Sequence, residues 1–131
     1  MVAGATGRKR LIAKPVASPT SRSLKYLRDN GYTCQTVEKF IVWTKRRLDL
    51  FGCIDIVAIK EGVTGVLGVQ ATTDTGGQMS KHYKKAIKIP ELKIWLLAGN
   101  RFILQCWALK GKAGKRKTYQ LREKEILLSE L

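Results

Sequence analysis

Two apolar runs close together in the chain restrict its fold more than any other feature. They are Ile54-Asp55-Ile56-Val57-Ala58-Ile59 and Val66-Leu67-Gly68-Val69-Gln70-Ala71-Thr72. Short apolar runs rich in β-branched residues are typical of strands. The sequence therefore predicts strands over roughly residues 50–60 and 66–72. The Lys60-Glu61-Gly62 segment between them favours a tight turn, so the two strands should lie at hairpin distance.

The segments before these strands predict a helix and another strand. Ser18-Pro19 favours a helix start, because serine caps helices and proline suits the first helical position. Asn30-Gly31 favours its end, because both residues accept a left-handed conformation. A strand is then expected over residues 32–43. The basic segment Lys45-Arg46-Arg47 indicates a turn or an exposed strand end.

The segments after these strands complete the predicted fold. They are a basic helix from Ser80 to Lys88, a helix over 90–98 with a strand at 93–98 as the alternative, a strand over 101–109, a basic loop over 110–117, and a last strand containing Tyr119 and Leu121. The resulting order is α-β-β-β-α-β plus a C-terminal strand. Helices on a mixed sheet give an α/β class. We expect a basic N-terminal tail over residues 1–17 and one domain over 18–131.

The charge of the chain narrows the class of partner. Its 131 residues include 25 Lys and Arg against 10 Asp and Glu, which gives a formal net charge of +15. A net charge of about 2–8 is enough for solubility. Such an excess is more typical of proteins that bind a polyanion, most often nucleic acid. A solubilising surface is the alternative.

Cysteine usage and hydropathy indicate the compartment. Cys34, Cys53 and Cys106 are widely spaced, no CxxC motif is present, and His82 is the single histidine. This pattern supports neither a disulfide framework nor a structural zinc site. No apolar stretch approaches the roughly 20 residues that span a bilayer, and no signal peptide is recognisable. We expect a cytoplasmic protein without a membrane partner.

The residues that suggest chemistry lie in the two apolar runs. Gln70 and Thr72 share one face of their strand, because side chains alternate along a strand. Asp55 is flanked by isoleucines, and burying a carboxylate is costly unless it has a partner or a metal. Pairing of the two strands would bring Asp55 and Gln70 together. Mg²⁺ prefers such oxygen ligands.

The element order and these two segments together resemble the PD-(D/E)XK nuclease superfamily. More narrowly, they resemble small phage and prokaryotic nucleases similar to archaeal Holliday-junction resolvases. The resemblance covers roughly residues 18–109 and implies a restriction-endonuclease-like core. It also implies Mg²⁺ or Mn²⁺ as cofactor, DNA as partner and a homodimer. A phage-encoded member would act in the host cell cytosol.

The resemblance also implies roles for individual residues. Asp55 matches the metal-binding aspartate, whereas Gln70 and Thr72 stand where the family has an acid and a lysine. Glutamine can ligate a metal through its carbonyl oxygen. Lys85 is the expected charge-stabilising lysine, with Lys81 as an alternative. Glu38 matches an upstream catalytic glutamate, and Asp49 is a further metal-ligand candidate; Arg46, Arg47, Lys81, Lys84 and Lys88 are the expected phosphate contacts.

The sequence thus predicts a metal-dependent DNA endonuclease, with branched or structured DNA as one candidate substrate. Two alternatives remain open. The departures at Gln70 and Thr72 favour a DNA-binding module that kept the fold without the activity. A charge of +15 is equally normal for an RNA-binding protein. Glu38 is alternatively a salt-bridge partner of Lys39 or Arg46, and the three tryptophans are expected in the core rather than as base-stacking platforms.

Overall fold

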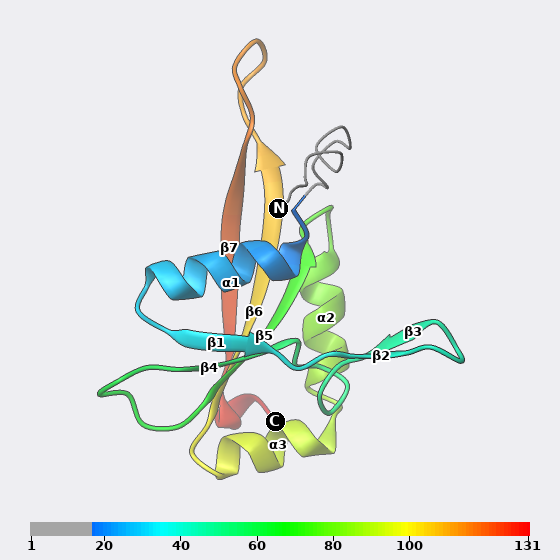
Figure 1. The fold of residues 1–131 in the computed structure, drawn as a ribbon, viewed down its shortest axis with the longest axis vertical. Coiled ribbons are helices and arrows are strands. Elements are labelled where there is room, and N and C mark those ends of the chain that lie inside the picture. The colour runs from blue at the N-terminus through cyan, green and yellow to red at the C-terminus, as the bar shows by residue number, and fades with distance from the viewer. Residues whose placement is uncertain (1–16) are drawn as a thin grey trace, which may run out of the picture.

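A five-stranded mixed sheet forms the centre of the protein in the computed structural model, which describes residues 17–131 (Figure 1). The strand order is β1-β4-β5-β6-β7. Its members are β1 (Thr33–Thr36), β4 (Ile56–Ile59), β5 (Leu67–Thr73), β6 (Arg101–Lys110) and β7 (Thr118–Ile126). Strands β5 and β6 run parallel, and every other neighbouring pair is antiparallel. This mixed sheet confirms the predicted α/β class.

Helix α1 (Pro19–Asp29) packs on one face of the sheet through Leu27. Its start was predicted from Ser18, whose side-chain oxygen accepts a hydrogen bond from the Ser21 backbone N–H at 3.1 Å. Leu27 belongs to a core cluster with apolar residues of β4 and β5, which point to the same face. The predicted first helix is therefore confirmed.

Helices α2 (Gln78–Ala86) and α3 (Pro90–Leu97) supply the core of the opposite face. Ala86 and Leu92 pack there with Phe102 and Leu104 of β6. The helix predicted over 90–98 is confirmed, and the alternative strand at 93–98 is wrong. A short 3₁₀ helix (Leu128–Glu130) follows β7. No helix among residues 17–131 is long and apolar enough to cross a membrane.

A separate two-stranded hairpin projects away from the central sheet (Figure 1). It consists of β2 (Lys39–Ile41) and β3 (Arg46–Leu48), joined by a turn over 42–45. The prediction of one strand over 32–43 is thus wrong. The chain leaves the sheet after Thr36, and the Val37 N–H donates to the Asp55 carbonyl where β1 ends. A local apolar pattern cannot show that a strand changes partner.

The strand predicted over 50–60 is shorter in the structure. Strand β4 begins only at Ile56, because residues 50–55 form a tight loop closed by a bridge between Leu50 and Ile54. Phe51 and Gly52 adopt left-handed φ angles of 55° and 82°, which no strand accommodates. The strand predicted over 66–72 is confirmed as β5. Of the predicted basic tail over residues 1–17, all but Ala17 lies outside the described residues.

Candidate metal centre

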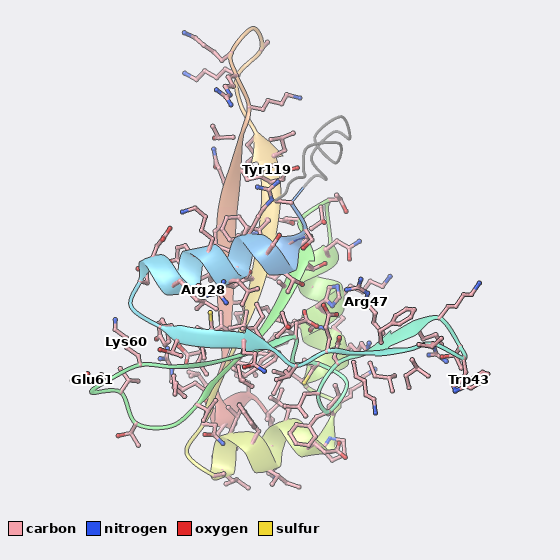
Figure 2. All side chains as sticks on the ribbon, in the orientation of Figure 1. Arg28, Trp43, Arg47, Lys60, Glu61 and Tyr119 are labelled. Atoms are coloured by element: carbon pink, nitrogen blue, oxygen red, sulfur yellow. The ribbon has the colours of Figure 1, made fainter. Side chains whose placement is uncertain are left out.

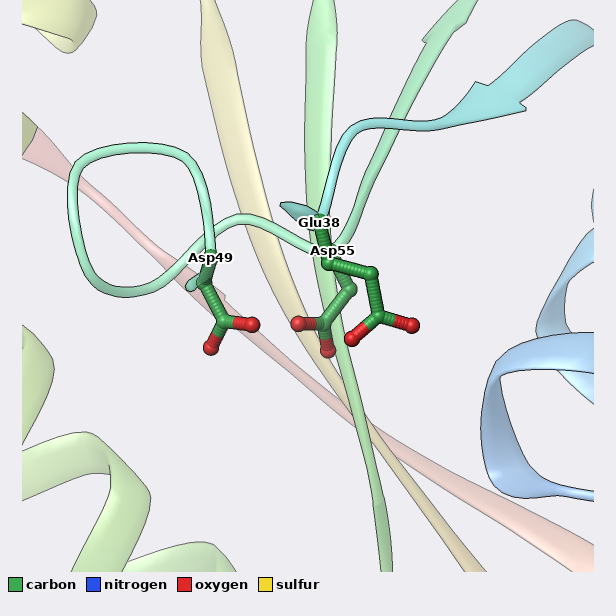
Figure 3. Close-up of side chains that lie close together, drawn as sticks. All are labelled: Glu38, Asp49 and Asp55. Atoms are coloured by element: carbon green, nitrogen blue, oxygen red, sulfur yellow. The ribbon is translucent and has the colours of Figure 1, made fainter. Parts of the chain in front are cut away.

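Three carboxylates converge where the hairpin joins the central sheet (Figure 3). Glu38, Asp49 and Asp55 each offer an oxygen atom, and these oxygens all lie within 4.8 Å of one another. Asp55 is buried, with 6% of its surface exposed, and the other two are partly buried. The structure therefore brings together three acidic residues that the sequence suggested separately.

The hairpin itself explains why Glu38 and Asp49 meet. Glu38 directly precedes β2 and Asp49 directly follows β3. The antiparallel register pairs Lys39 with Leu48, so the residues just outside the hairpin leave it side by side. The loop over residues 50–55 then turns the chain back, which places Asp55 beside the same two residues.

Asp55 is fixed in place by strand β5. Its backbone N–H donates to the Val69 carbonyl at 2.9 Å. Its carboxylate Oδ2 accepts a hydrogen bond from the Ala71 N–H, also at 2.9 Å. A charge-assisted bond of this kind holds a carboxylate in one orientation. The residue between these two partners is Gln70.

Gln70 lies on the face of β5 that turns away from α1. Val69 packs in the α1 cluster, so alternation places Gln70 on the α2 side of the sheet. The Gln70 side chain is buried, with 5% exposed, and Thr72 follows it on the same face. Ile56 pairs with Val69, so the register sets Gln70 across from Asp55. Gln70 remains a predicted ligand, and it lies on the same face of the sheet as Asp55.

The clustered acids change the acidity of Asp55. Burial, a hydrogen bond with the Asp49 carboxyl and the charges of Asp49 and Glu38 together raise the pKa of Asp55 to about 8, against the opposing effect of the Ala71 N–H. The cause is physical, since carboxylates this close cannot all ionise without a cation. Near neutral pH, the metal-free cluster therefore retains a proton that a divalent cation could replace.

One basic side chain pairs with the cluster, and the charge of a second acts on Cys53 nearby in the chain. Arg47 Nη1 lies 3.3 Å from Glu38 Oε1, with most of the arginine exposed. Arg47 is therefore the ionic partner of Glu38, in place of the expected Lys39 or Arg46. Burial, followed by the charges of Asp49 and Asp55, raises the pKa of the Cys53 thiol to about 12, against the opposing charge of Lys85 on α2. Lys85 thus acts electrostatically on the same neighbourhood as the acids.

The predicted phosphate contacts all lie on the surface. Lys81, Lys84 and Lys85 are exposed on α2, and Lys88 is exposed just beyond its end. Residues three and four apart share one helix face, so these lysines form a stripe. Arg46 is exposed on β3. His82, on the same helix, is partly buried, and burial followed by the charges of Lys85 and Lys81 lowers its pKa.

The donor set suits a hard divalent cation. Mg²⁺ holds oxygen ligands at about 2.0–2.1 Å, so ligands on opposite sides lie about 4.2 Å apart. The observed separations of up to 4.8 Å need only a small closure to reach this value. Asp55 and Asp49, with Glu38 or Gln70, are the residues that would hold the cation.

One exposed tryptophan was missed by the sequence reasoning. Trp43 was expected in the core, but it is 95% exposed at the turn of the hairpin, so that expectation is wrong. Trp95 and Trp107 are packed, and Trp107 donates a hydrogen bond to Ser23 Oγ at 2.9 Å. The basic residues near Trp43 in the sequence, such as Lys45 and Arg46, were the one available signal that this tryptophan is exposed.

Comparisons of the chain with protein-family models, with curated proteins and with solved structures found no match. What the site does must therefore be inferred from the arrangement of its own side chains. That arrangement is a buried carboxylate with two partly buried carboxylates beside it, bordered by exposed cations. It defines a candidate divalent-cation centre on a strongly basic α/β protein.

Proposed function

We propose that the protein is a metal-dependent nuclease that hydrolyses phosphodiester bonds in DNA. The observation that carries the proposal is the convergence of Glu38, Asp49 and Asp55 on a chain of net charge +15. A basic surface attracts a phosphate backbone. Clustered carboxylates on such a surface would repel phosphate, so their presence is better explained by a bound cation. A bound Mg²⁺ or Mn²⁺ would activate a water and stabilise charge on the phosphate.

The order of elements supports this proposal. Without the hairpin and helix α3, the chain runs α1, β1, β4, β5, α2, β6, and β5 and β6 are parallel neighbours. This sequence of elements agrees with the αβββαβ core of the PD-(D/E)XK superfamily, which the sequence resembles. The β2–β3 hairpin, helix α3 and strand β7 are additions to it. We propose a restriction-endonuclease-like core on these grounds.

The acidic cluster could replace the negative charge that is missing at Gln70 relative to the family pattern. Gln70 brings no charge where the family has an acid, which weakens a site that depends on Asp55 alone. Asp49 and Glu38 supply negative charge from the hairpin ends instead. Asp55 and Asp49 would hold the cation, and Gln70 would add a carbonyl oxygen.

A lysine cation is still needed at the reacting phosphate, because Thr72 cannot provide one. Lys85 would stabilise the charge that develops there. It is exposed on α2, and its charge influences Cys53, two residues before Asp55. Lys81 on the same helix is the alternative.

The surrounding cations would hold the DNA backbone. Arg46 and Arg47 lie on β3, directly before Asp49, and Lys81, Lys84 and Lys88 belong to the exposed lysine stripe on and just after α2. A further basic loop joins β6 to β7 over residues 110–117. Contacts to phosphates supply affinity without reading sequence. A homodimer, which the resemblance implies, would place two centres on one DNA.

A cleavage assay tests the proposal. Plasmid and branched DNA are incubated with Mg²⁺, Mn²⁺ or a chelator, using the wild type, Asp55→Asn and Asp29→Asn. Asp29 is an exposed acid that pairs with Lys25 on α1, so its variant is the matched control. We expect cutting with metal by the wild type and the control, and at least a hundredfold loss in Asp55→Asn, on the order of removing one key charge-stabilising group. Cutting that survives Asp55→Asn would remove the site assignment.

The second candidate is a DNA-binding module without catalytic activity. Gln70 and Thr72 favour it, because neither residue supplies the charge that the family pattern requires. In this case wild type and Asp55→Asn would bind DNA equally and neither would cut with either metal. If RNA competes far better than duplex DNA at matched salt, an RNA partner is favoured instead.

A further inference from the structure

The β2–β3 hairpin, residues 39–48, exposes an unusual apolar surface. Phe40 is 53% exposed, Val42 71% and Trp43 95%. Figure 2 shows Trp43 at the far end of the hairpin, away from the central sheet. A group of large apolar side chains held in water in this way marks an interaction surface.

The charge of the hairpin indicates which partner it fits. Lys39, Lys45, Arg46 and Arg47 belong to it, and it contains no acidic residue. A second copy of this chain would bring the same cations against each other, which opposes self-association. An aromatic tip between cations suits a nucleic acid, whose phosphates attract the cations and whose bases stack on the ring.

The hairpin is also attached to the acidic cluster at both ends. Glu38 precedes its first strand and Asp49 follows its second. Five residue steps at about 3.3 Å separate Glu38 from Trp43, which gives a reach of roughly 16 Å. A DNA strand advances about 3.4 Å per nucleotide, so this reach corresponds to about five nucleotides.

We propose that the hairpin inserts Trp43 between bases of duplex DNA, about five nucleotides from the phosphate at the acidic cluster. Apolar side chains that enter a base step partly unstack it, and flanking cations hold the backbone on either side. The distance to the cleaved phosphate rests on the proposed nuclease function. The base contact itself does not, because it needs no metal.

Tryptophan fluorescence in a chelator tests the base contact without cleavage. Adding a short DNA duplex to the wild type should quench the emission, because stacked bases quench an exposed indole. Trp43→Ala should lose the DNA-dependent quench and bind about tenfold more weakly, the order expected when one base-stacking aromatic is removed. Trp43→Phe should bind within about threefold of the wild type, since phenylalanine still stacks.

Ile94→Ala is the matched control, because Ile94 is an exposed apolar residue on α3 (66%) outside the hairpin. It should bind and quench like the wild type. Equal DNA binding and equal quenching in Trp43→Ala and the wild type would overturn the proposal. It is also overturned if sedimentation shows a wild-type dimer that Trp43→Ala dissociates while DNA binding stays unchanged. Tighter binding and stronger quenching with single-stranded RNA than with duplex DNA would overturn the choice of partner.

2-Aminopurine placed at successive positions of the duplex tests the distance. Its fluorescence should rise at about five nucleotides from the mapped cut with the wild type, and not with Trp43→Ala. A rise elsewhere, or none, contradicts the geometry. Quenching without any cleavage would refute the nuclease proposal and leave the base contact standing. Cleavage with no effect of Trp43→Ala on binding would refute the base contact and leave the nuclease proposal standing.

Discussion

At the scale of single residues, the proposed metal site depends on how Asp55 is held. The side chain is buried, accepts a hydrogen bond from Ala71 N–H, and lies beside Asp49 and Glu38. A structural carboxylate would have a basic partner to balance its charge, but Arg47 pairs with Glu38 rather than with Asp55. The ionised form of Asp55 is thus unfavourable in the absence of a cation.

The cost of ionising Asp55 in the folded protein predicts that stability depends on pH. The pKa of Asp55 is raised from 3.8 to about 8 in the folded protein, so the folded state binds a proton that the unfolded state releases. The contribution of Asp55 to the free energy of unfolding is therefore greatest below about pH 4 and is lost progressively up to about pH 8. Asp55→Asn keeps an acceptor for Ala71 and removes the charge.

We expect Asp55→Asn to stabilise the metal-free protein at pH 8 by on the order of 1 kcal/mol or more, with a smaller effect at pH 5. Urea denaturation in a chelator at both pH values measures the difference. Asp29→Asn, which alters an exposed ion pair, should change stability by less than about 0.5 kcal/mol at either pH. Equal effects of Asp55→Asn at pH 5 and pH 8 would mean that Asp55 is already ionised at both.

At the scale of elements, the sheet is tied to α1 by a buried polar contact. Trp107 of β6 donates its indole N–H to Ser23 Oγ at 2.9 Å, and Ser23 is fully buried. Trp107 was expected in the core, and it is there. The hydroxyl partner was not predictable, because nothing in the sequence relates Ser23 to a residue 84 positions away.

Ser23→Ala should therefore destabilise the protein by about 1–3 kcal/mol, because it leaves a buried N–H without a partner. The exposed Ser80 on α2 is the matched position, and Ser80→Ala should have almost no effect. Thermal or urea unfolding of the two variants decides this. If both behave alike, the contact does not hold α1 to the sheet.

The helices and strands differ in how well the sequence predicted them. Strand β5 and helices α1 and α3 were predicted closely, because their caps, turns and apolar periods are local signals. The hairpin was not, because the apolar run over 40–43 has the same local pattern whether it enters the core or leaves it. The grouping of Asp55 with Glu38 and Asp49 depends on that hairpin. Their side-by-side placement therefore became visible only in the structure.

At the scale of the whole molecule, the net charge of +15 would govern binding to the proposed DNA partner. An electrostatically bound protein loses affinity steeply with salt, with a slope of about −0.9 per phosphate neutralised on duplex DNA. Lys84 is exposed on α2 within the lysine stripe, whereas Lys25 on α1 is engaged with Asp29 at 2.7 Å. The two lysines therefore offer a test of which surface meets the DNA.

Lys84→Ala should weaken DNA binding equally across sequences and reduce the salt slope by about 1. Lys25→Ala should leave both quantities close to those of the wild type. Fluorescence anisotropy over a series of salt concentrations measures affinity and slope together. A larger loss from Lys25→Ala than from Lys84→Ala would place the DNA on the α1 face and contradict the proposed orientation.

The most direct test of the central claim is a calorimetric titration of Mn²⁺ into the wild type and Asp55→Asn at pH 7. The account predicts one Mn²⁺ bound per chain by the wild type, with release of the proton that Asp55 holds, and a loss of affinity of at least about tenfold in the variant. Absence of Mn²⁺ binding by the wild type, or equal binding by the variant, would contradict a metal centre at Glu38, Asp49 and Asp55.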